Sequence, residues 1–228
     1  MAEFDQFASE YKRILDQSTA IAGESSEYFT DYKAAFVERL LGGRSARILD
    51  FGCGVGTLSS ALAGRLPDAA IHGYDVSEDS LAQVEPALRQ RGLFTSDLAA
   101  LEGGYTLIVI SNVMHHIPVA ERQETVSRLA GYLALSGEIL VFEHNPMNPM
   151  TRLVVSRCAF DENAVLLHPR EMKRYFRAAG LDEIRKDYIV FFPKPLAALR
   201  SMEPAIGWCP VGAQYALRGA KRGNGSAV

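Results

Sequence analysis

The chain has few cysteines, and their arrangement excludes a disulfide framework. Cys53, Cys158 and Cys209 are the only three in 228 residues, and no Cys-x-x-Cys pair occurs. An odd number of cysteines cannot close a full set of disulfides. Because disulfides are rare in reducing compartments, we expect reduced thiols and a cytoplasmic protein.

An excess of positive charge is also lacking. Lys and Arg total 24 against 27 for Asp and Glu, which gives a net charge of −3. Proteins that bind nucleic acid through bulk electrostatics carry the opposite balance. We therefore expect no nucleic-acid partner, although this total is compatible with a local basic patch.

Long apolar runs are missing as well. Runs such as Leu107–Ile110 are far shorter than the ~20 residues that a helix needs to cross a bilayer. Residues 1–13 contain acidic side chains where an export signal has a basic start and an apolar run. We expect neither a membrane span nor an export signal. With 48% hydrophobic and 22% charged residues, the chain can form a globular core without disulfides or metals.

Helical periodicity dominates the first 41 residues and predicts an N-terminal helical cap over residues 1–43. Aromatic side chains, among them Tyr28 and Tyr32, recur at helical spacing in this part. Such a stripe packs into a core or covers a ligand. If it covers a ligand, Tyr28 and Tyr32 are candidate contacts for an apolar or aromatic substrate.

From Arg47 onward, short apolar runs alternate with helix-like segments. Strands are predicted at 47–51, 70–75, 93–96, 106–111 and 138–143, and helices at 57–66, 77–91 and 119–135. Ser77 is the expected N-cap of the second helix. This alternation is typical of βαβ units on a parallel sheet and predicts a domain over residues 44–220.

In the last third of the chain, strands and helices no longer alternate regularly. A helix is predicted at 169–179, and strands at 183–192 and 213–218 are separated by a proline-rich connection. Segment 145–168 is too long for a plain turn and is expected to form either a capping loop or a substrate lid. In a lid, Arg152 could bind a carboxylate or phosphate. Residues 221–228 are small and polar, which predicts a flexible tail.

The segment ILDFGCGVGTLSSAL places Asp50 at the end of a predicted strand, followed by Gly52, Gly54, Gly56 and a helix. Glycines let the backbone turn tightly beside a ligand, and a helix N-terminus offers unpaired N–H groups. The spacing is GxGxG rather than the GxGxxG of dinucleotide sites. A carboxylate at Asp50 would repel a pyrophosphate and attract a cationic ligand, and S-adenosylmethionine carries an ammonium and a sulfonium.

Two more aspartates follow the next predicted strands. Asp75 could accept hydrogen bonds from both ribose hydroxyls, in S-adenosylmethionine and in NAD alike. Asp97 could accept one from the amine of adenine. Each aspartate alone is equally compatible with a helix cap or a solvated loop. Three acids at successive strand ends favour a binding site.

The segments ILDFGCGVGTL, GYDVS, TSDL, IVISNVMHHIP and SGEILVFEHNP occur in this order between about residues 44 and 192. In order and spacing the chain resembles the Rossmann-like, class I S-adenosylmethionine-dependent methyltransferases that act on small molecules. The resemblance implies an α/β fold with a seven-stranded, mostly parallel sheet, an antiparallel C-terminal hairpin and helices on both faces. It also implies a cofactor site formed by Asp50, Gly52, Cys53, Gly54, Asp75, Val76, Asp97 and Leu98, with Asn112 near the methionine end.

Histidines follow the last two parallel strands, where such sheets place their ligands. A hydroxyl that accepts a methyl group benefits from a base that works near neutral pH, and histidine is the natural candidate. We expect His115 and His144 at the reacting end, with Glu143 as a further candidate. His116 is expected to turn into the protein as a structural residue.

His72 begins a strand and His168 precedes the first proline of a helix, so both are expected to be structural. Some relatives of the resembled family bind a divalent ion through Glu and His after the fourth strand. This chain has His115 and His116 there, so no metal site is expected.

The predicted function is methyl transfer from S-adenosylmethionine to a small-molecule acceptor, with O-methylation first and N- or C-methylation open. Segment 145–168 and the ending PVGAQYALRGAK resemble bacterial methyltransferases of secondary-metabolite, glycan or lipid-linked acceptors. The alternative is an NAD-dependent oxidoreductase on a similar sheet. Asp50 and the predicted terminal hairpin argue against this alternative. A non-catalytic S-adenosylmethionine-binding protein is a third possibility. The sequence does not indicate the oligomeric state.

Overall fold

The computed structural model describes residues 23–158, 161 and 163–221. Its strands are β1 (Arg47–Phe51), β2 (Ala70–Tyr74), β3 (Phe94–Thr95), β4 (Tyr105–Ser111), β5 (Leu133–His144), β6 (Leu181–Ile189) and β7 (Gln214–Lys221). Its α-helices are α2 (Ser26–Leu41), α3 (Thr57–Arg65), α4 (Glu78–Ala82), α5 (Pro86–Arg89), α6 (Arg122–Tyr132), α7 (Pro149–Val155), α8 (Pro169–Ala178) and α9 (Glu203–Ile206). The segments Leu98–Ala100 and Lys194–Met202 are 3₁₀-helical.

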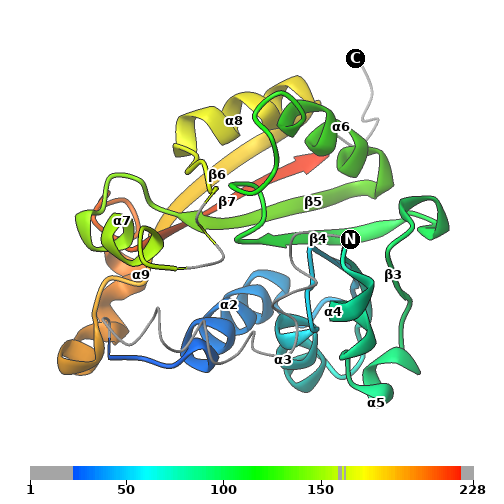
Figure 1. Cartoon of the computed structure of the whole chain (residues 1–228), viewed down its shortest axis with the longest axis horizontal. Coiled ribbons are helices and arrows are strands. Elements are labelled where there is room, and N and C mark those ends of the chain that lie inside the picture. Colours follow the sequence, from blue (N-terminus) through cyan, green and yellow to red (C-terminus); the bar gives the residue numbers. More distant parts are fainter. Residues whose placement is uncertain (1–22, 159–160, 162, 222–228) are drawn as a thin grey trace.

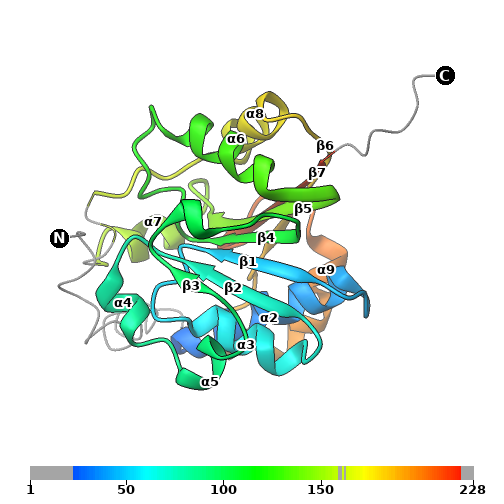
Figure 2. The same ribbon diagram turned by 90° about the vertical axis from the view of Figure 1, so that its right-hand side faces the viewer.

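The seven strands form one sheet in the order β3-β2-β1-β4-β5-β7-β6. Strands β1 to β5 pair in parallel, and β7 runs antiparallel to both of its neighbours, β5 and β6. Helices α6 and α8 cover one face of the sheet, and α2 and α3 cover the other (Figures 1 and 2). The predicted mostly parallel sheet with an antiparallel C-terminal hairpin is therefore confirmed.

Strand β4 shows why the sheet is buried on both faces. Side chains alternate along a strand, so neighbouring residues point to opposite faces. Leu107 and Val109 pack in the apolar layer shared with α2 and α3, whereas Ile108 and Ile110 pack in the layer shared with α6 and α8. The unbroken apolar run is thus what a central parallel strand requires.

Two predicted helices end earlier than their patterns indicated. The helix predicted at 77–91 is divided into α4 and α5, with Pro86 in the first turn of α5. Proline has no N–H and cannot continue the hydrogen-bond ladder of a preceding helix. Ser77 caps α4 as predicted, since its side chain accepts a hydrogen bond from the Ser80 N–H at 3.1 Å. The helix predicted at 119–135 ends at Tyr132, because Leu133 already pairs with Tyr105 of β4.

The two ends of the chain lie partly outside the described residues. Of the predicted N-terminal cap, residues 1–22 are not described, and α2 forms most of the rest. Of the predicted tail, Lys221 instead ends β7, and residues 222–228 are not described. Within the described ranges, no helix has both the length and the apolar character needed to cross a membrane.

Candidate active site

A cavity of about 900 Å³ opens where the carboxyl ends of β1, β2, β4 and β5 meet α2 and α7. Most of the site residues predicted from the sequence line it. They are Asp50, Gly52, Cys53, Gly54, Asp75, Val76, Leu98, Asn112, His115 and His144. The structure therefore brings the glycine turn and the histidines together in one space, as expected at the carboxyl edge of a parallel sheet.

Hydrogen bonds to Asp75 and packing against Val113 hold the glycine turn after β1 in place. The Gly54 N–H donates a hydrogen bond to Asp75 Oδ2 at 2.7 Å, and the Ser77 N–H donates one to Asp75 Oδ1 at 2.9 Å. Gly52 has a φ of 76°, and a Cβ atom there would lie 2.3 Å from Val113 Cγ2. A Cβ at Gly54 would meet no atom within 4 Å. The backbone at Gly54 thus has open space beside it for a ligand.

Asp50 is a buried carboxylate at the base of this turn. It is 1% exposed, and one of its oxygens accepts a hydrogen bond from Ser59 Oγ at 2.6 Å. Burial raises the pKa of Asp50 to about 6, against the opposing effects of the Ser59 hydrogen bond and the charge of Lys33. A carboxylate that is this poorly solvated favours a cationic partner.

Lys33 was not anticipated from the sequence. It is 5% exposed, it lines the cavity from α2, and its Nζ donates a hydrogen bond to Ser111 Oγ at 2.9 Å. Burial lowers the pKa of Lys33 to about 8, although the charges of Glu143 and Asp50 oppose this shift. The sequence does contain a signal for it. Lys33 shares the helical spacing of Val37 and Leu41, which places it on the buried stripe of α2.

Asn112 directly follows β4 and has a backbone conformation that is uncommon for residues other than glycine. Its φ is 56°, in the left-handed region. Its side-chain oxygen Oδ1 is buried and has no hydrogen-bond partner among the described residues. An unpaired buried acceptor is costly, so a donor on a ligand in this cavity would stabilise it.

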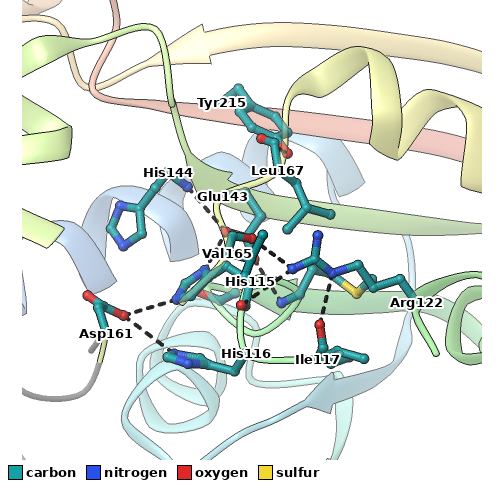
Figure 3. A network of polar contacts seen from close by, with 12 residues as sticks. His115, His116, Ile117, Arg122, Glu143, His144, Asp161, Val165, Leu167 and Tyr215 are labelled. Atoms are coloured by element: carbon teal, nitrogen blue, oxygen red, sulfur yellow. Dashed lines mark hydrogen bonds and ion pairs between the residues drawn. The ribbon is translucent and has the colours of Figure 1, made fainter. Parts of the chain in front are cut away.

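Five side chains meet beside the carboxyl ends of β4 and β5, and we call them the histidine cluster: His115, His116, Glu143, His144 and Asp161 (Figure 3). Glu143 is fully buried and accepts a hydrogen bond from the Met114 N–H at 2.8 Å. Its other oxygen lies 2.6 Å from Nδ1 of His115. Asp161 Oδ1 lies 3.1 Å from Nε2 of His115 and 3.5 Å from Nε2 of His116.

His116, expected to turn into the protein, lines the cavity together with His115. The side chain of His115 is 1% exposed, whereas that of His116 is 20% exposed and lines the cavity. The cause is Glu143 on the adjacent strand β5, which binds the backbone of Met114 and the ring of His115 together. His115 is therefore the more buried ring, held between Glu143 and Asp161, although it also lines the cavity.

The two candidate bases sit in different electrostatic environments. Burial acts to lower the pKa of His115, but the charge of Glu143 and hydrogen bonds to Asp161 and Glu143 outweigh it and raise that pKa to about 9. Burial and the nearby charge of His115 lower the pKa of His144 to about 4. In the ligand-free protein, His144 is thus neutral at pH 7, whereas both ring nitrogens of His115 already face carboxylates.

Three members of the histidine cluster could hold a metal ion. One ligand atom each from His115, His144 and Asp161 lies within 4.8 Å of the others. His115 follows β4, His144 ends β5 and Asp161 follows α7, so only the folded chain brings them together. No metal was expected from the sequence, in which these three residues are far apart and form no recognisable ligand motif.

Four of the predicted site residues do not line the cavity. Asp97 is exposed and accepts a hydrogen bond from the Ala99 N–H at 2.8 Å, which makes it the cap of a 3₁₀ turn. Arg152 is exposed on α7. Tyr28 and Tyr32 lie on a neighbouring face of α2, because a helix presents only one stripe of residues to a given partner.

Tyr28 and Tyr32 contact charged residues outside the cavity. The guanidinium of Arg200 lies 4.2 Å from the ring centroid of Tyr28. Burial, together with the neighbouring Glu203, raises the pKa of Tyr32. The cavity side of α2 instead presents Phe29, Thr30 and Lys33.

The other two histidines have the structural roles that the sequence indicated. Nδ1 of His72 lies 3.3 Å from the hydroxyl of Tyr105. Nδ1 of His168 accepts a hydrogen bond from the Arg170 N–H at 3.2 Å and so caps α8. Neither ring lines the cavity formed by the described residues.

Comparison with known proteins agrees with this geometry. Residues 26–186 match the methyltransferase domain family. A trans-aconitate 2-methyltransferase from Methylobacterium nodulans is 29% identical over 157 residues, which is 68% of this chain and 55% of that protein. A ribosomal RNA small subunit methyltransferase C from Vibrio vulnificus is 28% identical over 125 residues, 50% of this chain and 37% of that protein. The chain thus spans about half, or less, of the length of these curated relatives.

A solved structure shows the same fold over almost the whole chain. Magnesium protoporphyrin IX methyltransferase from Synechocystis PCC 6803, with bound S-adenosylhomocysteine, superimposes with a TM-score of 0.64 over 96% of each chain at 17% identity. The matched family covers well over half of this chain. This protein therefore belongs to the class I S-adenosylmethionine-dependent methyltransferases.

Proposed function

We propose that this methyltransferase acts in the cytoplasm on a hydroxyl group of a small-molecule acceptor. The observation that carries the proposal is the single cavity that joins the glycine turn to the histidine cluster. A volume of about 900 Å³ is at the upper end of the range for small-molecule sites, so it has room for a cofactor and an acceptor together.

The residues at the glycine turn fit S-adenosylmethionine. Asp50 and the unpaired Oδ1 of Asn112 would accept hydrogen bonds from its ammonium group. Lys33 would pair with its carboxylate, and Asp75 at the end of β2 would accept hydrogen bonds from the ribose hydroxyls. The open space beside Gly54 leaves the backbone accessible to the ligand. When bound, the cofactor supplies a methyl group that its positive sulfur has already activated.

Several apolar side chains line the cavity near the histidine cluster. Phe29, Met150, Val154 and Phe191 line it. Of the aromatic residues that suggested an aromatic or apolar acceptor, Phe29 and Phe191 line the cavity and support it, whereas Tyr28 and Tyr32 do not line it. The histidine cluster is the polar end of this space, where His115 and His144 would orient the hydroxyl that receives the methyl group.

The class of acceptor is the finer part of the proposal. Two of the compared proteins are named for small molecules, and one is named for ribosomal RNA. The net charge of −3 favours a small molecule for this chain. We infer an acceptor in secondary-metabolite, glycan or lipid-linked biosynthesis.

The first experiment is calorimetric titration with S-adenosylhomocysteine and, separately, with NADH. Micromolar binding of the first ligand alone is expected. Asp75→Ala should weaken it by about 10- to 100-fold, because hydrogen bonds to a charged group contribute about 1.5–3 kcal/mol. Asp97→Ala is the matched control and should change the affinity less than about 3-fold, since Asp97 lies outside the cavity. Equal losses in both variants would contradict the proposed cofactor position.

A second experiment addresses the acceptor. Small molecules with a hydroxyl group, and total RNA in parallel, are incubated with the enzyme and methyl-labelled S-adenosylmethionine. The proposal expects label on an oxygen of a small molecule. Label on RNA, or on nitrogen or carbon only, would contradict it.

A further inference from the structure

We propose that His115, His144 and Asp161 bind a divalent transition-metal ion at the reacting end of the cavity. Their three ligand atoms lie within 4.8 Å of one another, and all three residues line the cavity. Bonds of 2.0–2.2 Å to a tetrahedral ion would place such atoms roughly 3.4 Å apart. Side-chain rotations that shift the atoms by about 1 Å would therefore close the site around an ion.

Glu143 supplies an independent observation, because it holds Nδ1 of His115 and so leaves Nε2 as the nitrogen that would bind an ion after losing its proton. Nδ1 of His115 faces a Glu143 oxygen at 2.6 Å, and the Met114 N–H holds the other oxygen of that carboxylate at 2.8 Å. Nε2 of His115 faces Asp161 Oδ1 at 3.1 Å, so an ion between the two would take the place of a proton on Nε2. Metal-binding histidines usually donate their second N–H to a carboxylate or carbonyl in this way.

The segment that carries Asp161 is tied to the histidine cluster by the backbone. The Val165 N–H donates a hydrogen bond to the His115 carbonyl at 2.9 Å. The buried guanidinium of Arg122 donates one to the Val165 carbonyl at 2.7 Å and another to the Ile117 carbonyl at 2.9 Å (Figure 3). Through these hydrogen bonds, Arg122 links the segment before α8 to the loop after β4. This link holds Asp161 near His115 and His144.

Charge and ligand type indicate which ions fit. Glu143 and Asp161 bring two carboxylates into a site with little exposure to water, and their side chains are 0% and 10% exposed. A divalent cation with neutral imidazoles would balance them. Imidazole nitrogens suit zinc, iron, cobalt and nickel, whereas magnesium and calcium prefer sites made only of oxygen. The proposal therefore concerns the first group of ions.

An ion at this place would face the acceptor. A cation lowers the pKa of a hydroxyl that coordinates it and orients that oxygen. This role rests on the proposed function, whereas the binding of the ion does not. The competing interpretation is a doubly protonated His115 held between Glu143 and Asp161, with no ion.

The test is a titration of the full chain, without a tag and stripped by a chelator, with Co²⁺ followed by visible absorption. Wild type is expected to bind one equivalent with d–d bands of a nitrogen- and oxygen-coordinated ion, and one equivalent of Zn²⁺ should displace it. His144→Ala and Asp161→Asn should each weaken Co²⁺ binding at least 10-fold. Glu143→Gln should also weaken it, because it disturbs the orientation of His115.

Two controls keep the outcome interpretable. His168→Asn removes a histidine outside the histidine cluster and keeps an N-cap oxygen for α8, so its Co²⁺ affinity should equal that of wild type. Binding of S-adenosylhomocysteine to each metal-free variant reports that the variant is folded. Absence of stoichiometric Co²⁺ binding in wild type would overturn the proposal, as would equal affinities in His144→Ala, Asp161→Asn and His168→Asn. Tight Co²⁺ binding by a protein that methylates no hydroxyl would instead overturn only the proposed function.

Discussion

Lys33 shows how a single residue can reveal where a ligand binds. Its ammonium group lies in the cavity, 2.9 Å from Ser111 Oγ and 5.8 Å from the ring centroid of Phe142. Burying an ammonium without a full ion pair is unfavourable, which the lowered pKa of Lys33 reflects. An anionic group on a ligand would compensate this cost, and the carboxylate of S-adenosylmethionine is such a group.

At the residue scale we expect Lys33→Met to weaken binding of S-adenosylhomocysteine by about 10- to 100-fold, since one charge-assisted hydrogen bond is lost. Calorimetry measures the effect. The ligand 5′-methylthioadenosine lacks the amino-acid portion, so its affinity should be the same for wild type and Lys33→Met. An equal loss for both ligands would mean that Lys33 supports the structure of the site rather than the carboxylate.

The same pairing has a pH dependence with a definite sign. The ammonium of Lys33 is charged below its pKa of about 8 and neutral above it. Affinity of wild type for S-adenosylhomocysteine should therefore fall as the pH rises through about 8, beyond any change shown by Lys33→Met. Parallel profiles of the two proteins would argue against the pairing.

At the scale of elements, the glycine turn between β1 and α3 is the part that the sequence describes best. The acid, the three glycines and the following helix are local in sequence, and local geometry determines their contacts. Gly52 combines a φ of 76° with close packing against Val113. A side chain at this position would therefore meet both backbone strain and a steric clash.

We expect Gly52→Ala to lower the free energy of unfolding by about 1–3 kcal/mol and to weaken binding of S-adenosylhomocysteine, because the turn must shift away from Val113. Denaturant unfolding and calorimetry measure the two effects. Gly64→Ala is the matched control, since Gly64 lies within α3 and a Cβ there meets nothing within 4 Å. It should leave stability unchanged or raise it by about 0.5–1 kcal/mol. Equal stability of the two variants would show that the turn adapts.

Other elements were less accessible to sequence reasoning. The helical pattern of residues 77–91 was real, but Pro86 divides it, and β5 begins at Leu133 because pairing with β4 outweighs local helix preference. Tyr28 and Tyr32 share α2 with the cavity residues, and only the rotation of the helix against the sheet decides which stripe faces the ligand.

At the scale of the whole molecule, the order of the elements was predictable, whereas the histidine cluster was not. Alternating strands and helices determine the parallel sheet, and the family match together with the antiparallel β7 decides against the NAD-dependent alternative. Contacts such as that between His115 and Asp161 join residues 46 positions apart. No periodicity indicates which of the intervening side chains meet, so the orientation of His115 and His116 could not be derived.

The binding site also lowers the stability of the whole molecule. We expect to measure this effect on the free energy of unfolding at Asp50. Burial raises the pKa of Asp50 from 3.8 to about 6, so the charged form is less favourable in the folded than in the unfolded chain. This destabilisation is complete above about pH 6, diminishes as the pH falls toward 4, and is absent well below pH 4, where both states are protonated. Each pKa unit corresponds to about 1.4 kcal/mol.

Asp50→Asn should therefore be more stable than wild type by about 1–3 kcal/mol at pH 7.5, and the difference should shrink toward zero at pH 4. Denaturant unfolding of both ligand-free proteins at the two pH values measures this. The variant should also bind S-adenosylhomocysteine more weakly, because its neutral amide cannot attract the ammonium group. A variant that is less stable than wild type at pH 7.5 would show that the hydrogen bond to Ser59 and the charge of Lys33 outweigh the burial of the carboxylate. Stability gained with affinity lost would instead show that Asp50 is retained for binding at the expense of the fold.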